Sequence, residues 1–332
     1  MPDYSIRPLC FSHVDLPREF FGGVPIHSGE GVSASPMIYV LVSGRDDAGV
    51  VHHYLVDAGF HADKWMHRFG FYDWEPPETV LGKVGVRPEQ IEKVFLTHMH
   101  FDHANNVGAF ENAEVYVQWD EYQGWLQALA LPDLYTPLGE ESWLTSSFDR
   151  DDARVFGELA RDHRLKFVGD DEELLPGVRG HLSRGGHTFG TQWISVDTSG
   201  GRYVVAGDAV MWYSNVEEMW PSGYTNGSTY TMLMTYGEIH RYLGGDLDRI
   251  VPGHDTLVFD RHPSWKIGPN EVAEVHVAGW DTSLRDSSHD ATRISATSFF
   301  PETQLRWRRN TSMSCPGTIR SSSPSTYPWI CP

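Results

Sequence analysis

The most constraining feature of the sequence is a run of metal-binding side chains at 97–103, Thr-His-Met-His-Phe-Asp-His, which directly follows a short apolar segment. Imidazoles and carboxylates are ligands that first-row metals prefer, and their clustering indicates a metal site. His98 and His100 are two positions apart on a predicted strand end, so their side chains point the same way. Asp102 and His103 follow where the chain turns into a helix, and they can therefore face a second metal.

Three further motifs each place one metal ligand where a predicted strand meets a loop. His187 stands in the glycine-rich segment 185–190, Asp208 follows a strand, and His254 follows another. Side chains at such junctions can converge from distant parts of a chain. Because four residues cannot close the ligand shells of two metals, these three complete the set. Asp208 is the natural bridge between the two metals.

The predicted elements mix strands with helices. Strands are predicted over 37–42, 50–56, 94–96, 113–117, 178–182, 192–196, 203–206 and 250–251, and helices over about 103–110 and 229–243. Polar groups at the strand ends favour a layered α/β fold with its site along one sheet edge.

Aromatic residues gather in two places that could border the site. The stretch of about 120–165 has a helical, aromatic pattern and is predicted to be an insertion that caps the metals; alternatively, its aromatic residues only pack an extra helical layer. A second aromatic group follows Asp208. The predicted substrate-pocket residues are Trp119, Trp125, Met211, Trp212, Trp220 and Tyr224.

Composition limits the partners and the domain organisation. The chain has 332 residues, and a hydrophobic content of 40% is enough for one sizeable core, predicted over 1–278. Its net charge of −19 disfavours nucleic acid and anionic membrane surfaces. The segment 279–332 is rich in Ser, Thr, Arg and Pro, and is predicted to be a disordered tail or sequence foreign to the domain.

Location and assembly are predicted only in outline. The sequence shows no basic segment followed by an apolar stretch at its start and no window of 18 apolar residues. Its 3 cysteines are too few for a disulfide framework. These features predict a cytoplasmic protein. The oligomeric state stays open, with a homodimer among the alternatives.

Over residues 35–260 the sequence resembles the metallo-β-lactamase superfamily. The resemblance rests on seven residues in the expected order: His98, His100, Asp102, His103, His187, Asp208 and His254. It implies a four-layer αββα sandwich with a helical aromatic insertion. It also implies two divalent metal ions, usually Zn²⁺, with Mn, Fe or Co as alternatives.

The resemblance further implies how the ligands are shared between the two metals. The first metal group would be His98, His100 and His187, and the second metal group would be Asp102, His103 and His254. Asp208 would bridge the two metals. Asp57 would orient a ligand histidine by a hydrogen bond.

Within the superfamily, the motifs at 98–103, 207–209 and 252–255 are most similar to those of the N-acyl homoserine lactonases, a quorum-quenching group. That group carries a tyrosine three residues after the bridging aspartate, where it assists the substrate carbonyl. Met211 occupies this position here, and the nearest hydroxyl is that of Tyr213. Either Tyr213 takes over the role, or the substrate differs.

These observations predict a dinuclear metal-dependent hydrolase that opens a lactone or cleaves a carboxylic ester. A metal-bridging hydroxide would attack the carbonyl of a small molecule, and Asp102 would pass the proton to the leaving group. An aspartate bridge argues against a β-lactamase with a cysteine ligand. Two alternatives stay open: a thioesterase of the glyoxalase II type, and a non-catalytic metal-binding protein on the same fold.

Overall fold

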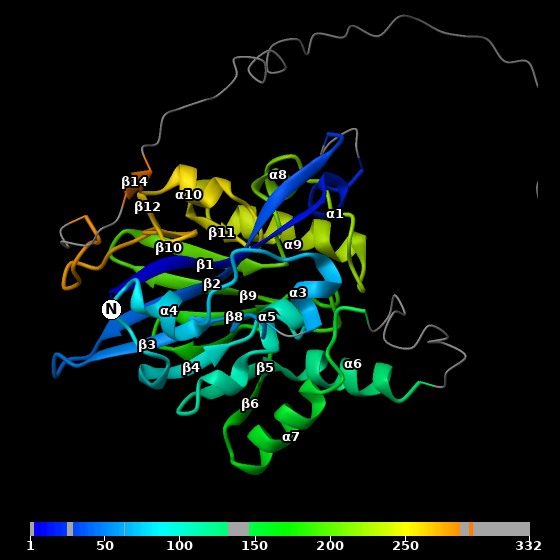
Figure 1. The fold of residues 1–332 in the computed structure, drawn as a ribbon, viewed down its shortest axis with the longest axis horizontal. Coiled ribbons are helices and arrows are strands. Elements are labelled where there is room, and N and C mark those ends of the chain that lie inside the picture. Colours follow the sequence, from blue (N-terminus) through cyan, green and yellow to red (C-terminus); the bar gives the residue numbers. More distant parts are fainter. Residues whose placement is uncertain (1–2, 25–28, 63, 132–145, 286–291, 295–332) are drawn as a thin grey trace, which may run out of the picture. The chain divides into compact units, whose positions relative to one another are not determined.

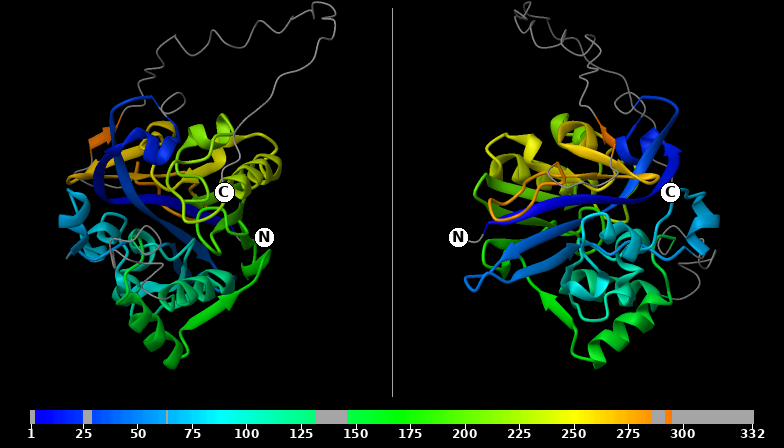
Figure 2. Two further views of the ribbon diagram at one scale, coloured as in Figure 1. Left: turned by 90° about the vertical axis from the view of Figure 1, so that its right-hand side faces the viewer. Right: turned by 60° about the vertical axis from the view of Figure 1, so that its left-hand side comes forward.

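The protein is described here from a computed structural model, which covers residues 3–24, 29–62, 64–131, 146–285 and 292–294 (Figure 1). Two β-sheets lie face to face between two layers of helices (Figure 2). This arrangement confirms the predicted αββα sandwich.

The larger sheet has nine strands among the described residues. In spatial order they are β14 (Thr292–Ile294), β12 (Ser264–Ile267), β13 (Asn270–Ala273), β1 (Tyr4–Pro17), β2 (Val32–Arg45), β3 (Val51–Val56), β4 (Ile91–Phe95), β5 (Glu114–Gln118) and β6 (Leu165–Val168). Both faces are buried: on β2, Tyr39 and Leu41 join the helix-covered core, while Val40 and Val42 join the core that contains the second sheet. This double burial explains why the central strands have nearly continuous apolar sequences.

The smaller sheet has five strands in the same described ranges. In spatial order they are β11 (Ile250–Pro252), β10 (Gly201–Gly207), β9 (Gln192–Thr198), β8 (Val178–Leu182) and β7 (Glu172–Leu175). The strands β10 and β11 are parallel, with Gly207 opposite Pro252. Since parallel strands end at the same sheet edge, Asp208 and His254 emerge side by side.

Helices cover the two outer faces. On the side of the larger sheet lie α3 (Lys64–Phe69), α4 (Pro77–Gly82), α5 (Phe101–Ala104), α6 (Trp119–Leu129) and α7 (Asp152–Arg161). On the other side lie α8 (Tyr213–Glu217), α9 (Thr229–Tyr242) and α10 (Leu257–Arg261), and α1 (Arg18–Gly22) follows β1. Short 3-10 turns occur at Pro88–Gln90, Val107–Ala109 and Leu247–Arg249.

The longest of these helices, α9, shows why its sequence is helical. Ser228 accepts a hydrogen bond from Thr231 N and so caps the helix start. Met232, Tyr236 and Ile239 recur at helical spacing and are all buried against the smaller sheet. The sequence predicted this helix over 229–243, close to its observed bounds.

One predicted helix is shorter than expected. The sequence predicted 103–110, but α5 ends at Ala104 and only a 3-10 turn follows. The backbone is engaged elsewhere: the His103 carbonyl accepts from Ala58 N, and Asn106 N donates to the Gly59 carbonyl. The loop 57–59 therefore takes up backbone groups that a longer helix would have used.

The predicted cap and tail are described only in part. In the segment 120–165, the described helices α6 and α7 bury Trp125 and Phe156 against the larger sheet, and residues 132–145 lie outside the described residues. Near the predicted tail, Asp281 forms an ion pair with Arg7 at 2.7 Å, and β14 pairs with β12. The remainder of 279–332 lies outside the described ranges.

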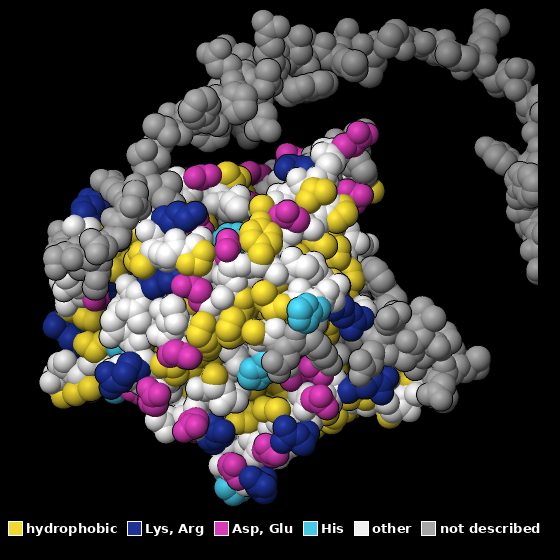
Figure 3. Space-filling view, viewed as in Figure 1, with side chains coloured by type: hydrophobic (Ala, Val, Ile, Leu, Met, Phe, Trp, Pro, Cys, Tyr) yellow, Lys and Arg dark blue, Asp and Glu magenta, His cyan; other side chains and the backbone are white. Residues whose placement is uncertain are grey.

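On the face in Figure 3, acidic and basic side chains are interspersed, so the negative net charge does not gather there. None of the helices in the described parts of the chain is long and apolar enough to cross a membrane.

Candidate metal centre

The predicted ligands converge at one edge of the two sheets. His98 and His100 follow β4 on the loop that leads into α5, whose first turn carries Asp102 and His103. The other ligands come from loops that adjoin the smaller sheet. All seven ligands fall into two clusters whose nitrogen and oxygen atoms are close enough to share a metal.

The first metal group surrounds one oxygen of Asp208. The Oδ2 atom of Asp208 lies 3.2 Å from His187 Nε2 and 3.9 Å from His98 Nε2. His100 Nδ1 is 3.0 Å from His187 Nε2. These nitrogen and oxygen atoms point toward one another. Ligand atoms arranged about 2.0–2.2 Å from a shared ion would be directed in the same way.

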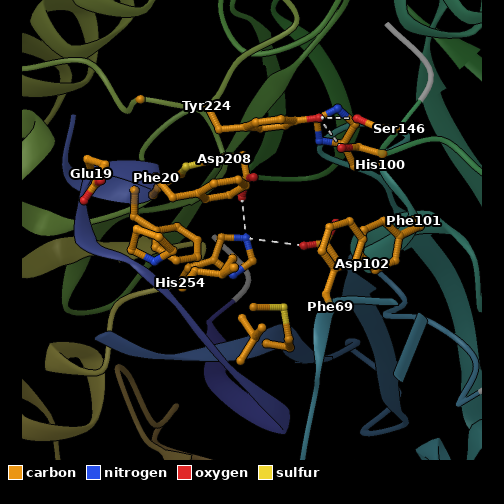
Figure 4. A pocket seen from close by; sticks show the side chains of 18 of the residues that line it. Glu19, Phe20, Phe69, His100, Phe101, Asp102, Ser146, Asp208, Tyr224 and His254 are labelled. Carbon is orange, nitrogen blue, oxygen red and sulfur yellow. Dashed lines mark hydrogen bonds and ion pairs between the residues drawn. The ribbon is translucent and has the colours of Figure 1, made fainter. Parts of the chain in front are cut away.

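The second metal group surrounds the other oxygen of the same carboxylate. Asp208 Oδ1 lies 3.0 Å from His254 Nε2 and 3.3 Å from His103 Nε2. Asp102 Oδ2 is 3.6 Å from both of these nitrogens. Figure 4 shows Asp102, Asp208 and His254 facing one another at the base of a pocket. Asp208 thus presents one oxygen to each group, which is the geometry expected of a bridging ligand.

Unsatisfied atoms test whether these residues fit two metals. His98 Nε2, His103 Nε2 and Asp208 Oδ1 are buried and have no hydrogen-bond partner of adequate geometry among the described residues. Buried polar atoms are normally satisfied, because leaving one unpaired costs about 1–3 kcal/mol. Three such atoms directed at the same small space fit a site for divalent cations.

Hydrogen bonds hold the ligand rings from behind. Asp57 Oδ2 lies 2.8 Å from His103 Nδ1, and Asp57 Oδ1 accepts from Thr97 N. His254 Nδ1 faces the Pro36 carbonyl at 3.1 Å, and His100 Nε2 faces Asn226 Oδ1 at 2.8 Å. Each contact leaves the other ring nitrogen of that histidine directed at the centre. Asp57 thus lies within hydrogen-bond distance of one of the candidate ligand histidines.

The electrostatics of the two groups differ. Burial lowers the pKa of His187 to about 3 and that of His100 to about 4, so both rings are neutral. For His103, burial alone would lower the pKa, but the carboxylates of Asp208, Asp102 and Asp57 raise it well above its usual value. In the metal-free protein, a proton on His103 therefore supplies the positive charge that a cation would otherwise bring to the second metal group.

A pocket of about 600 Å³ opens directly over the centre (Figure 4). His100, Asp102, Asp208 and His254 form part of its wall. Most other lining residues are apolar: Val14, Leu16, Phe20, Phe21, Met37, Phe69, Phe71, Phe101 and Met211. Of the residues that the sequence assigned to a substrate pocket, Met211 and Tyr224 are among its lining residues.

The four predicted pocket tryptophans do not line this pocket. Trp119 is half exposed and packs on Phe167, and Trp125 is fully buried beneath His100. Trp212 donates to the His254 carbonyl, so it supports the ligand loop from behind. Trp220 packs against the backbone of Gly23. Of the described part of 120–165, only Ser146 and Ser147 reach the pocket.

Tyr213 also lies away from the substrate space, which corrects the prediction of a catalytic role. Its hydroxyl donates to the Ile250 carbonyl at 2.8 Å, and its buried ring stacks under the Arg261 guanidinium. Tyr224 does line the pocket, and its hydroxyl bonds to the Ser147 hydroxyl. The Tyr213 side chain points away from the pocket because Tyr213 is the first residue of α8, and the buried face of this helix packs into the core.

Comparison with known proteins agrees with this architecture. The family model of the metallo-beta-lactamase superfamily matches residues 38–254, more than half of the chain and all seven ligands. The chain belongs to the metallo-β-lactamase superfamily. Within it, a curated N-acyl homoserine lactonase of Bacillus cereus is 27% identical over 150 residues, covering 43% of this chain and 48% of the relative.

A second curated relative and a solved structure are also similar to this chain. The N-acyl homoserine lactonase AiiA of Bacillus thuringiensis subsp. kurstaki is 28% identical over 43% of this chain and 48% of its own length. The matched part thus spans about half the length of these curated relatives. A crystal structure of a probable metal-dependent hydrolase from Staphylococcus aureus superposes with a TM-score of 0.57 at 22% identity, covering 76% of this chain and 90% of that one.

Two further solved structures with a similar fold contain a bound ligand. An AiiA variant from B. thuringiensis with bound N-decanoyl-L-homoserine has a TM-score of 0.57 at 19% identity, covering 77% of this chain and 95% of that one. AidC, described as a dizinc quorum-quenching lactonase, has a TM-score of 0.55 at 14% identity, covering 85% and 95%. At these identities the likeness shows the fold.

Sequence reasoning missed several residues of the site. Phe20, Phe21, Phe69 and Phe71 line the pocket, yet their segments carry no ligand motif. Glu121 was also missed, although its buried carboxylate contacts two ligand loops. A glutamate in the first turn of a helix is common, and the sequence around Glu121 does not distinguish a buried side chain from an exposed one.

Proposed function

We propose that this protein is a dinuclear metal-dependent hydrolase that opens the ring of a lactone bearing an apolar acyl substituent. The observation that carries this proposal is the opening of an apolar pocket directly onto four of the seven converging candidate ligands, His100, Asp102, Asp208 and His254. The N-acyl homoserine lactonases to which the chain is similar supply the substrate class. An ester with a comparable apolar group belongs to the same chemistry.

The two ligand groups support this reaction by what they can bind. When bound, two divalent cations, most simply Zn²⁺, supply a nucleophilic hydroxide at neutral pH and polarise the carbonyl. His98 Nε2 and His103 Nε2, which have no hydrogen-bond partner among the described residues, would help to hold them. Asp102 is the ligand carboxylate with the greater exposure, at 15% for its side chain against 3% for Asp208. We therefore assign Asp102 the transfer of a proton to the leaving alkoxide.

The pocket wall supports an apolar substituent. A volume of about 600 Å³ lies within the range of small-molecule sites. Phe20, Phe69 and Phe71 give it an aromatic wall, while the exposed Arg68 and Glu19 stand among its lining residues. An acyl chain of several carbons would gain from leaving water there, at about 0.8 kcal/mol for each buried CH₂.

Tyr224 is our candidate for the hydroxyl that assists the carbonyl. Its ring stacks on Phe20 at 4.7 Å and lies 5.9 Å from the His100 ring, so it stands beside the first metal group. Its hydroxyl contacts Ser146 and Ser147, which fix its direction (Figure 4). Met211 lies in the pocket wall but carries no hydroxyl.

Metal analysis and a substrate panel test the proposal. The purified protein should hold about two metal ions per chain and open acyl homoserine lactones faster than it cleaves simple esters or thioesters. His103→Ala should abolish the activity, whereas the control His240→Ala, at an exposed position of α9, should keep it. Faster thioester cleavage would favour the glyoxalase II alternative. Metal-loaded protein that is inactive on lactones, esters and thioesters would contradict the proposal and favour a non-catalytic role.

A further inference from the structure

The buried carboxylate of Glu121 is fully engaged by four hydrogen-bond donors. Glu121 lies in the first turn of α6 and has no exposed surface. Its Oε1 accepts from Met99 N at 2.8 Å and from Trp125 Nε1 at 2.7 Å. Its Oε2 accepts from Thr188 Oγ1 and from Gly190 N, both at 2.7 Å. With every donor directed at an oxygen, the carboxylate is held in one orientation.

Three of these donors belong to the two loops that carry the first metal group. Met99 separates His98 from His100, and Thr188 and Gly190 follow His187. One carboxylate thus connects loops whose ligands are 87 residues apart in the sequence. The same loops meet again where Gln192 N donates to the Thr97 carbonyl. Glu121 adds a side-chain connection directly beneath the ligands.

The packing leaves no room for the loop to shift toward the helix. A Cβ atom on Gly190 would lie 2.2 Å from Glu121 N, and one on Gly124 would lie 2.2 Å from Phe189 Cγ. The backbone of 187–190 therefore rests directly on the start of α6. Only glycine at both positions permits this approach.

The charge of Glu121 also favours cations at the site. None of the ion pairs found within the described ranges involves Glu121, so no Lys or Arg balances its charge. Four hydrogen bonds and the helix start offset part of the cost of burying a carboxylate. A cation held by the neighbouring histidines would offset more of it.

We infer that Glu121 is a positioning residue for the first metal group, fixing the loops of His98, His100 and His187 at the separation that a metal requires. The inference rests on the proposed metal centre. It does not depend on which substrate is hydrolysed.

The variant Glu121→Gln tests this role with little change of volume. An amide offers one oxygen, so its NH₂ group must face one of the two donor pairs. Facing Thr188 and Gly190 is less costly, because the Thr188 hydroxyl can turn to accept while the Gly190 N–H cannot. The variant should therefore loosen the His187 loop and leave the Met99 bond intact.

The readout is metal binding, measured by competition with a chelator and by metal content after dialysis. We expect the holoprotein to retain about two ions and the Glu121→Gln variant about one. The affinity of the first metal group should fall by about 10- to 100-fold. The visible absorption of cobalt-loaded protein should change with it. Asp120→Asn removes the same charge from the adjacent, exposed position and should bind metal as the unaltered chain does.

Two results would overturn the inference. One is a folded Glu121→Gln variant that binds both metals with unaltered affinity, because Glu121 would then only stabilise the fold. If that variant does not fold, Thr188→Val removes one donor, and unaltered metal affinity in it would be equally decisive. Unaltered protein that binds two metals but opens no lactone would refute the proposed function and leave this inference standing.

Discussion

At the scale of single residues, Asp57 shows how much of the centre depends on side chains that touch no metal. It is the first non-glycine residue along the chain with a positive φ, 67°, in the described ranges. This backbone turn directs both carboxylate oxygens toward Thr97 and His103. The αL region is open to Asp and Asn but costly for most other residues.

Replacing Asp57 by Asn keeps the backbone conformation and removes the charge. We expect Asp57→Asn to lower metal affinity by about 10- to 100-fold, because His103 loses its carboxylate partner. A metal titration monitored with a chromophoric chelator measures this. Asp73 also has a positive φ, 54°, but is exposed, so Asp73→Asn is the matched control. Equal affinities in the two variants would contradict the assigned role.

The two tyrosines give opposite expectations. Tyr224→Phe should lower kcat on a lactone by at least about tenfold, as loss of a hydrogen bond formed in the transition state predicts. Tyr213→Phe should leave kcat and KM unchanged but lower the free energy of unfolding by about 1 kcal/mol, because the bond to the Ile250 carbonyl is lost. Steady-state kinetics and urea unfolding separate the outcomes. An inactive Tyr213→Phe with unchanged stability would reverse the assignment.

At the scale of elements, the contact between α6 and the loop 187–190 is a closely packed support of the site. Gly124→Ala would push a methyl group into Phe189, and we expect it to lower the unfolding free energy by about 1–3 kcal/mol. Gly157→Ala in α7 has open space around it and should instead stabilise by about 0.5–1 kcal/mol. Urea midpoints compare the two. A neutral Gly124→Ala would show that the loop can retreat from the helix.

The elements also show what the sequence could predict. The ligand loops were predictable because polar ligand residues follow soon after the ends of apolar strands. This occurs after Phe95, the last residue of β4, and after Gly207, the last residue of β10. The strand β1 and the aromatic pocket wall were not, since Phe20 and Phe69 acquire their position only from the packing of α1 and α3 around the centre. The sequence assigned Trp125 to the pocket, but its ring packs beneath His100 in the core. An aromatic residue near ligands in the sequence can lie on either side of them.

At the scale of the whole molecule, metal binding, protonation and folding are linked. Without metal, His103 has a raised pKa, so its ion pairs stabilise the fold fully below the unfolded value of 6.5. That contribution is lost as the pH rises through the raised folded value. Metal binding needs neutral histidine, so it becomes easier over the same range.

We therefore expect chelation to lower the Tm more at about pH 9 than at about pH 7. Metal-free protein loses stability as His103 deprotonates, whereas the metal-bound form gains from tighter binding. Differential scanning calorimetry with and without a chelator measures the shift. Zinc added to metal-free protein in weak buffer should also release protons near neutral pH. A Tm shift that shrinks with rising pH would contradict this linkage.

Much of the apolar pocket wall comes from parts of the chain that carry none of the candidate metal ligands. Val14, Leu16, Phe20 and Phe69 belong to β1, α1 and α3, whereas all seven ligands stand on other segments. Substitutions that reshape the wall therefore need not disturb the centre. Under the proposed function, a laboratory evolution campaign is expected to change the preferred acyl group by altering these wall residues alone.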